Sequence, residues 1–272
     1  MLYNKQNPLR CFFAFEGYNS QGLALNRLKQ NFPDFDWVCV GRSEIDKYAI
    51  AAADALFPEA KDKNYGSITD INWDDVPDFD LFTMSSPCQD FSSAGKQAGG
   101  EEGSGTRSSL LWECRKAIVA KKPKFIVFEN VPALLHKKFL PGFLKWVAEL
   151  ENYGYSNFYQ ILNAADYGTP QHRKRVFMVS ILDADHGFNF PKPFPLEKRL
   201  KDVLEENVGE EYYLKDEQVA RILDHCDRKV AEGCGFKPNF QEADAVSGTI
   251  TGNYGQRETD PYLKEYEENN PT

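Results

Sequence analysis

Short apolar runs alternate with amphipathic stretches over roughly the N-terminal two thirds of the chain. Apolar runs of strand length lie at 11–15, 37–40, 81–84, 125–128 and 176–181. Between them, apolar residues recur at helical spacing in 23–30, 48–56, 110–120 and 143–150. Strands that alternate with helices pack as βαβ units around a parallel sheet, so the pattern predicts a doubly wound α/β fold.

Two stretches interrupt this alternation. The first, 85–107, is rich in glycine, and the second, 163–174, contains Pro170. Long loops in a compact domain usually form lids or binding sites. Both stretches are therefore candidate parts of a functional site, and 85–107 is the natural lid.

A proline-rich segment marks the end of the α/β pattern. Pro191, Pro193 and Pro195 fall within 188–195 and predict a hinge. Beyond it, helical spacing recurs in 217–230, and the remaining sequence is polar and contains glycine. We therefore divide the chain into a large α/β domain, 1–187, and a smaller second region, 188–272.

The bulk composition fits a globular protein. A chain of 272 residues with 42% hydrophobic residues can form one large α/β domain with a modest appendage. No apolar run approaches the ~18 residues that span a bilayer, and the first residues lead into polar sequence rather than an apolar signal core. We expect a soluble cytoplasmic protein without a membrane partner.

The cysteines indicate neither a disulfide framework nor a metal site. The six cysteines form no Cys-x-x-Cys pair, and reduced thiols fit best. His225, Cys226 and Cys234 lack a fourth ligand and have the wrong spacing for a closed zinc site. We expect no bound metal.

The net charge of −9 argues against indiscriminate coating of nucleic acid, because phosphate contacts require many Lys and Arg side chains. Basic residues do gather locally in 172–175 and 192–201. A local basic face for a polyanion is therefore compatible with the overall acidity.

A glycine turn follows the first predicted strand. The sequence Phe15-Glu16-Gly17-Tyr18-Asn19-Ser20 lies between this strand and a helix, where a cofactor can approach the backbone at the helix N-terminus. Glu44 and Asp70 follow the next two extended runs. Each acid alone is compatible with surface charge, but in series they favour an adenosine-type ligand, with Glu44 on the ribose hydroxyls and Asp70 on the adenine amino group.

Three further pieces carry candidate chemistry. Pro87-Cys88-Gln89 opens the glycine-rich loop, where a thiol can be exposed and activated as a nucleophile, although an incidental loop cysteine is the alternative. Glu129 directly follows another strand, which places it at the same sheet edge. The basic run 171–175 precedes the last strand, with a solvated basic turn as the alternative.

These pieces occur in a recognisable order. Pro-Cys-Gln at 87–89, Glu-Asn-Val at 129–131 and Gln-x-Arg-x-Arg at 171–175, preceded by Phe-x-Gly at 15–17, resemble the cytosine-C5 DNA methyltransferase family. Flanking segments such as Asp-Phe-Ser at 90–92 are similar to those of family members encoded by phages and mobile elements. The resemblance implies a Rossmann-like class I methyltransferase fold, with a mostly parallel sheet and a small incomplete C-terminal region, in a bacterial or phage-encoded protein.

The resemblance also implies a reaction and its residues. The family transfers a methyl group from S-adenosylmethionine to carbon 5 of a cytosine that is flipped out of double-stranded DNA. Cys88 would add to carbon 6, Glu129 would hydrogen-bond N3 and the exocyclic amine, and Arg173 or, as the better candidate, Arg175 would bind the carbonyl oxygen. The cofactor residues would be Phe15, Gly17, Tyr18, Asn19, Glu44, Ile45, Asp70, Ile71, Pro87 and Leu110.

Some of these assignments have alternatives. Ile71 and Leu110 could simply be core residues. Asn19 stands where the family usually has a second glycine, but asparagine tolerates a positive φ better than most residues, so we expect the turn to survive.

The family's closing motif is absent after 248–260, which resembles only the entry to a target-recognition region. We therefore expect 188–272 to be the hinge and the start of that region, partly disordered at its polar end. Three explanations stay open: a second polypeptide supplies the remainder, the chain is a truncated piece, or it is a minimal variant in which the missing parts are dispensable. The alternatives are a tRNA cytosine-5 methyltransferase, or a cofactor-binding subunit that is inactive alone.

Overall fold

The computed structural model describes residues 2–86, 107–184, 187–206, 208–234, 239–250 and 260–263. These residues divide into two compact units. The first unit is Met1–Ile161 with Arg175–Phe190, and the second is Leu162–Lys174 with Pro191–Thr272. No helix among the described residues is long and apolar enough to cross a membrane.

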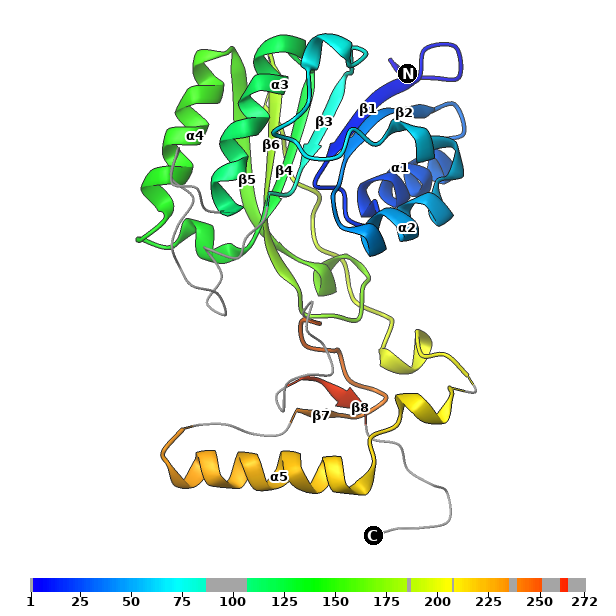
Figure 1. The fold of residues 1–272 in the computed structure, drawn as a ribbon, viewed down its shortest axis with the longest axis vertical. Helices are drawn as coiled ribbons and strands as arrows, with labels where there is room; N and C mark the ends of the chain where they lie inside the picture. Colours follow the sequence, from blue (N-terminus) through cyan, green and yellow to red (C-terminus); the bar gives the residue numbers. More distant parts are fainter. Residues whose placement is uncertain are drawn as a thin grey trace. The chain divides into compact units, whose positions relative to one another are not determined.

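A six-stranded sheet organises the described part of the first unit (Figure 1). The strand order is β2-β1-β3-β4-β6-β5. Strand β1 pairs in parallel with β2 and β3, and β3 pairs in parallel with β4, whereas β6 is antiparallel to β4. The predicted doubly wound, mostly parallel α/β fold is thereby confirmed. The strands are β1 (Leu9–Ala14), β2 (Trp37–Ser43), β3 (Leu81–Met84), β4 (Phe125–Asn130), β5 (Tyr155–Asn163) and β6 (Lys174–Leu182).

Strand β5 was not predicted from the sequence. Its residues YSNFYQILN contain no continuous apolar run, and its middle is solvent-exposed. The strand lies at the end of the sheet order, and no other strand of the described residues pairs with its outer edge. Its exposure on the sheet face explains why its hydrophobic pattern is weak.

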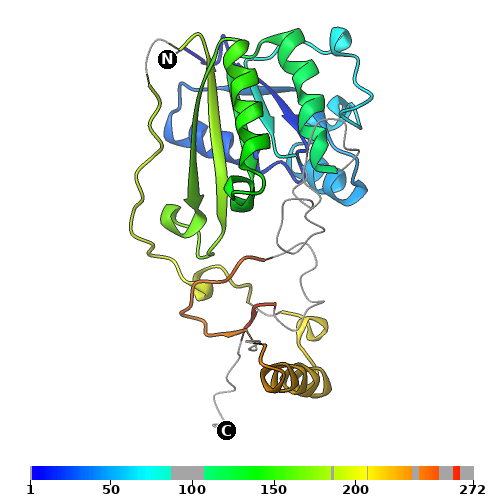
Figure 2. The ribbon, with the colours of Figure 1, turned by 90° about the vertical axis from the view of Figure 1, so that its left-hand side faces the viewer.

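Helices cover both faces of the sheet (Figure 2). Phe12 of β1 lies in one apolar cluster with Trp112 and Trp146, and helices α3 and α4 contribute to that cluster. Phe13, the next residue, lies in the other cluster, against which Leu23 of α1 packs. Side chains alternate across a strand, so both faces of β1 are buried. The helices are α1 (Ser20–Asn31), α2 (Lys47–Leu56), α3 (Cys114–Lys121) and α4 (Leu140–Asn152), with 3-10 turns at Pro58–Lys63, Trp73–Asp75, Arg107–Glu113 and Pro132–Leu135.

An aromatic group holds the middle of the sheet. The Phe12 ring lies 5.1 Å from the Trp73 ring, 5.3 Å from the Phe79 ring and 5.9 Å from the Phe82 ring, measured between centroids. A Cβ on Gly41 of β2 would meet the Phe12 ring at 2.6 Å, so this position of the strand requires glycine. The packing joins β1 to β2, and the residues that follow both strands are candidate site residues.

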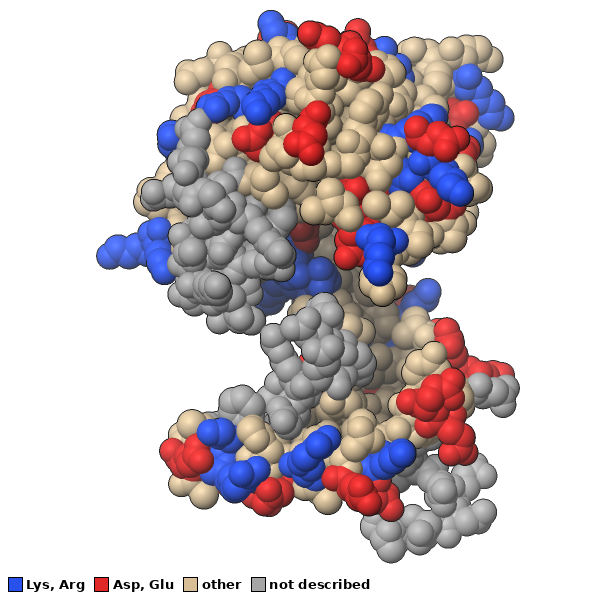
Figure 3. Space-filling view, in the orientation of Figure 1, with Lys and Arg blue, Asp and Glu red and all other residues tan. Residues whose placement is uncertain are grey.

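The second unit contains the predicted helix at 217–230, observed as α5 (Asp216–Ala231). Acidic and basic side chains alternate along α5, as Figure 3 shows, while Ile222 and Cys226 are buried. The unit also contains a pair of short parallel strands, β7 (Phe240–Gln241) and β8 (Tyr262–Leu263). Its remaining 3-10 turns are Ala164–Tyr167, Leu200–Asp202 and Glu210–Tyr212.

The interruption at 163–174 is an ordered part of the second unit. Its residue Asp166 accepts a hydrogen bond from the Phe194 amide at 3.1 Å, and Tyr167 donates one to the Pro191 carbonyl at 2.9 Å. The His172 amide donates to the Ser247 carbonyl at 2.7 Å. The proline-rich segment and the residues before the C-terminus therefore both pack against this stretch. The functional division into 1–187 and 188–272 stays a prediction.

An ion pair at the amino ends of β1 and β3 allows a stability prediction. Arg10 donates to Asp80 from Nε at 3.0 Å and from Nη2 at 2.9 Å. Burial raises the pKa of Asp80, but the hydrogen bonds from Arg10 outweigh that effect and hold the pKa below its ordinary value. The pair therefore stabilises the fold above the unfolded-state pKa of about 3.9, and this contribution is lost as the pH falls through the lower folded-state value.

We expect Asp80→Asn to lower the free energy of unfolding at pH 7 by about 1 kcal/mol or less, because Arg10 is half-exposed to solvent. Urea unfolding at pH 7 and near pH 3 checks this. The difference between variant and wild type should shrink at the lower pH, and a constant difference would contradict the ionic origin.

Candidate active site at the carboxyl ends of the strands

The parallel strands bring their carboxyl ends to one edge of the sheet. The turn after β1, Glu44 after β2, Ser85 and Ser86 after β3, and Glu129 at the end of β4 all lie at this edge. Strand β6 runs antiparallel to β4, so its beginning reaches the same edge, with Phe177 opposite Glu129. Ligands in open α/β sheets bind outside this edge, which makes it the candidate site.

Glu129 and Arg175 form an ion pair. The Arg175 Nε lies 2.9 Å from the Glu129 Oε1, and their side chains are 17% and 28% exposed. A charge-assisted bond of this length fixes the orientation of both groups, and their partial exposure leaves the pair accessible to a ligand. The structure thus brings together two residues that the sequence analysis assigned to the same base.

Arg173, the other arginine of the run, belongs to the second unit. Its carbonyl accepts a hydrogen bond from the Ala164 amide at 3.0 Å, and its amide donates to the Gln171 carbonyl at 3.0 Å. Its backbone therefore stabilises the 163–174 stretch. A role on the base stays a prediction for Arg173.

Three polar residues missed by the sequence analysis connect the strand ends. Asn130 is buried, and its Nδ2 donates to the Ser86 carbonyl at 3.3 Å while its Oδ1 accepts from the Val131 amide at 2.9 Å. The Ser85 hydroxyl donates to the Phe15 carbonyl at 3.0 Å. These bonds tie the beginning of the glycine-rich loop to β4 and to the first turn. The available signal was an asparagine at a buried strand end, directly after Glu129.

Pro87 and Cys88 lie outside the described residues, as does the rest of the predicted lid up to residue 106. The chain enters this segment from Ser86, which is held against Asn130 as described above. The assignment of Cys88 as the nucleophile and of Pro87 to the cofactor side stays a prediction.

The turn after β1 contains left-handed backbone at three of its five residues. Phe15, Gly17 and Asn19 have φ values of 54°, 59° and 64°. Asn19 thus adopts the positive φ expected of it, and it also caps α1 by accepting a hydrogen bond from the Gly22 amide at 2.8 Å. A Cβ on Gly17 would meet no atom of the described residues within 4 Å, so no described residue fills the space before this glycine. Open backbone at a helix N-terminus suits an anionic or polar ligand.

Glu44 is held by three backbone N–H groups. Its Oε2 accepts from Gly17 at 2.9 Å, and its Oε1 accepts from Ile45 at 2.8 Å and from Asp46 at 2.9 Å. An ionised carboxylate has about four acceptor positions, so these bonds from the described part of the chain leave one of them, on Oε2. The orientation of the carboxylate is therefore fixed before any ligand arrives.

The other predicted cofactor residues surround these elements. Tyr18 and Ile45 are exposed, at 56% and 74%. Asp70 is exposed in a turn, where its Oδ1 accepts from the Thr69 hydroxyl at 2.9 Å. Ile71 and Leu110 are partly buried against the larger apolar cluster. This position is compatible with a contact to a ligand and equally with the alternative that both are simply core residues.

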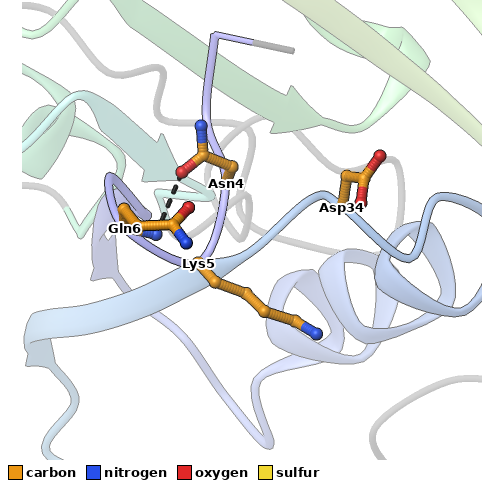
Figure 4. A pocket seen from close by; sticks show the side chains of 4 residues that line it. All are labelled: Asn4, Lys5, Gln6 and Asp34. Atoms are coloured by element: carbon orange, nitrogen blue, oxygen red, sulfur yellow. Dashed lines mark hydrogen bonds between the residues drawn. The ribbon is translucent and has the colours of Figure 1, made fainter.

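A hollow of about 320 Å³ lies elsewhere on the first unit (Figure 4). Its lining residues are Asn4, Lys5, Gln6 and Asp34. They precede β1 and β2, so the hollow lies at the amino ends of the strands, opposite the candidate site.

The described residues contain no group of three His, Cys, Asp or Glu side chains that could hold a metal ion.

Comparison with known proteins identifies a family for this chain. Residues 14–269 match the family model described as C-5 cytosine-specific DNA methylase. The chain is 51% identical to the type II methyltransferase M2.ScrFI of Lactococcus lactis subsp. cremoris, over 78% of this chain and 72% of that protein. It is 42% identical to the orphan methyltransferase M.SssI of Spiroplasma monobiae, over 57% of this chain and 41% of that protein.

Solved structures share the fold. The S. pombe Dnmt2 methyltransferase superposes with a TM-score of 0.71 over 96% of this chain and 78% of that one, at 21% identity. The Entamoeba histolytica methyltransferase EhMeth gives a TM-score of 0.69 over 92% of this chain and 73% of that one, at 18% identity. At these identities the likeness concerns the fold alone.

Proposed function

Because the chain belongs to the C-5 cytosine-specific DNA methylase family, we propose that it methylates carbon 5 of cytosine in double-stranded DNA with S-adenosylmethionine as the methyl donor. The observation that carries the proposal is the Glu129–Arg175 ion pair at the carboxyl-end edge of the sheet. Ser86, the residue before Pro87 and Cys88, is held at the same edge by Asn130. A carboxylate can accept from the exocyclic amine of a cytosine ring, and a guanidinium can donate to its carbonyl oxygen.

Cytosine carbon 5 is a poor nucleophile, so the ring requires covalent activation. The Cys88 thiolate forms a bond to carbon 6, which moves electron density to carbon 5. After carbon 5 has accepted the methyl group, with S-adenosylhomocysteine as the leaving group, a base takes the carbon 5 proton, the bond to Cys88 breaks and the aromatic ring is restored. No residue of this chain is assigned as that base, and water can serve. The target base leaves the duplex for this chemistry, because its ring is inaccessible within the stack.

Glu129 and Arg175 act on the ring edge. Glu129 accepts from the exocyclic amine and from N3 as that nitrogen becomes protonated, and Arg175 donates to the carbonyl oxygen. Their contacts stabilise the charge that develops when Cys88 adds. Because the two side chains already bind each other at 2.9 Å, both groups are oriented before the base binds.

The residues of the first turn and those directly after β2 are suited to bind S-adenosylmethionine. S-adenosylmethionine supplies an electrophilic methyl group when bound. Gly17 offers open backbone, and Glu44 offers the free acceptor position of Oε2 to a ribose hydroxyl. Ile45 presents its exposed side chain beside Glu44, where it can pack on an adenine ring.

Transfer of a labelled methyl group distinguishes the substrate classes. We expect label from S-adenosylmethionine to appear in duplex DNA and not in transfer RNA. Label in transfer RNA alone would favour the tRNA alternative, and label in neither nucleic acid would favour an inactive cofactor-binding subunit. Adding the C-terminal part of a relative in trans tests the predicted second polypeptide, which would raise the rate on DNA.

The bacterial relatives support a cytoplasmic location, where chromosomal and phage DNA are both accessible. Methylation of the host chromosome in expressing cells, detected by sequencing of 5-methylcytosine, would test this location directly.

We expect Glu44→Gln to weaken S-adenosylhomocysteine binding by about 1–3 kcal/mol, because a hydrogen bond to a charged acceptor is lost. Titration calorimetry measures the change. Asp36→Asn is a matched control, since Asp36 lies at the other end of β2 and also accepts from a backbone amide, that of Trp37 at 2.9 Å. Equal weakening in both variants would contradict the ribose contact.

A further inference from the structure

A buried charge network lies behind the turn of the proposed cofactor site. Arg42 of β2 is 1% exposed and Glu16 of the turn is 3% exposed. The Arg42 Nη1 donates to the Glu16 Oε1 at 2.6 Å. Its other nitrogens donate to Asp54 of α2 and to the carbonyls of Ala60 and Lys61, the last two at 3.0 Å. One guanidinium thus connects the turn, helix α2 and the 3-10 turn that follows it.

This network is poorly explained as a source of stability. Burial raises the pKa of the Glu16 carboxyl, and the attraction to Arg42 only partly offsets that rise. The Glu16 Oε2 is buried without a hydrogen-bond partner among the described residues. Replacing a buried ion pair by apolar residues is often neutral or stabilising, so such a pair is weak evidence for a stabilising role. A geometric role fits the observations better.

The element that Glu16 controls is strained. Phe15 and Gly17, its neighbours on both sides, have left-handed backbone, and so does Asn19. Left-handed conformations of non-glycine residues persist only where the surroundings impose them. Side-chain contacts with β2 and with the residue that follows it help to impose them here: Arg42 holds the Glu16 side chain, and Glu44, directly after β2, accepts from the Gly17 amide at 2.9 Å. The Phe15 amide also donates to the Ser43 carbonyl at 2.8 Å, and the Phe15 carbonyl accepts from the Ser85 hydroxyl.

We propose that Glu16 and Arg42 are positioning residues for S-adenosylmethionine, whose buried ion pair fixes the strained turn at 15–19 in the geometry that the cofactor requires. The inference rests on the proposed function, since it concerns the cofactor of that same site. Neither residue contacts the cofactor in this role. Each acts through Gly17, Asn19 and Glu44, and therefore affects cofactor affinity rather than the chemical step.

Two variants test this role. Glu16→Gln keeps the shape and removes the charge, and Arg42→Lys keeps the charge and removes the fork of donors that reaches four acceptors. For both we expect the Kd for S-adenosylhomocysteine and the KM for S-adenosylmethionine to rise roughly 10- to 100-fold, the range for losing a supporting contact of a ligand site. The kcat at saturating cofactor and the KM for DNA should stay within about threefold of wild type.

Asp80→Asn is the control, because it breaks an Arg–Asp pair that joins the beginnings of β1 and β3. This pair lies at the sheet edge opposite the candidate site. It should lower the unfolding midpoint without changing the Kd for S-adenosylhomocysteine. Circular dichroism and thermal unfolding confirm that each variant is folded, and Arg42→Lys carries the test if Glu16→Gln does not fold.

The outcomes distinguish a failure of the positioning role from a failure of the proposed function. If wild type binds S-adenosylhomocysteine and both variants bind it within about threefold, the positioning role is overturned and the proposed function stands. A fall in kcat with an unchanged KM for S-adenosylmethionine overturns it equally, as does a rise in Kd for Asp80→Asn that matches the variants. Failure of wild type to bind S-adenosylhomocysteine overturns the proposed function itself.

Discussion

Cys88→Ser should lower methyl transfer to DNA by at least about 10³-fold, because a serine hydroxyl at neutral pH cannot replace a thiolate as the nucleophile. In the proposed site the cofactor is held by the turn after β1 and by Glu44, which belong to other strand ends. Binding of S-adenosylhomocysteine should therefore stay within about threefold of wild type in calorimetry. Transfer itself is measured with labelled methyl donor and duplex DNA.

A second measurement separates nucleophilic addition from general damage to the loop. DNA that carries 5-fluorocytosine at the target position cannot lose its carbon 5 substituent, so wild type should remain covalently attached to it. The Cys88→Ser variant should form no such adduct. Retained methyl transfer, or an adduct in the variant, would overturn the assignment of Cys88.

Glu129→Gln should lower kcat by about 10²- to 10³-fold, the effect of removing one contact that strengthens as charge develops on the substrate. The amide can still accept from Arg175, but it cannot supply the negative charge opposite a protonated N3. The Kd for S-adenosylhomocysteine should be unchanged, since Glu129 lies on β4 and the predicted cofactor residues Gly17 and Glu44 lie after β1 and β2. Steady-state kinetics on duplex DNA measures the first quantity, and calorimetry measures the second.

The chain offers a matched control for this substitution. Glu149 of α4 also pairs with an arginine, Arg115, at 3.3 Å, and its side chain is similarly buried, at 18% exposure. It lies between two helices rather than at a strand end, so Glu149→Gln should leave kcat unchanged. A purely cofactor-binding defect in Glu129→Gln, or an equal loss in both variants, would show that Glu129 does not act on the base.

The sequence by itself determined the alternation of strands and helices and the position of the motif residues along it. Short, mostly apolar runs such as 81–84 and 125–128, which alternate with helical spacing, predict buried parallel strands, and the residues after such strands lie at one sheet edge. The tolerance of Asn19 for a positive φ was also predictable, because it depends on the residue type and its local turn. These properties are local, so a single sequence carries them.

The tertiary structure decided what depends on contacts between distant residues. Strand β5 forms at the sheet edge because β6 offers it a partner, although its own pattern is weak. The antiparallel register of β6 places Arg175, the arginine next to Val176 in that strand, against Glu129. The partners in the Glu16–Arg42–Asp54 network are 26 and 12 residues apart along the chain. A buried charge is indistinguishable from a surface charge until the fold has removed its water, which is why only the structure revealed it.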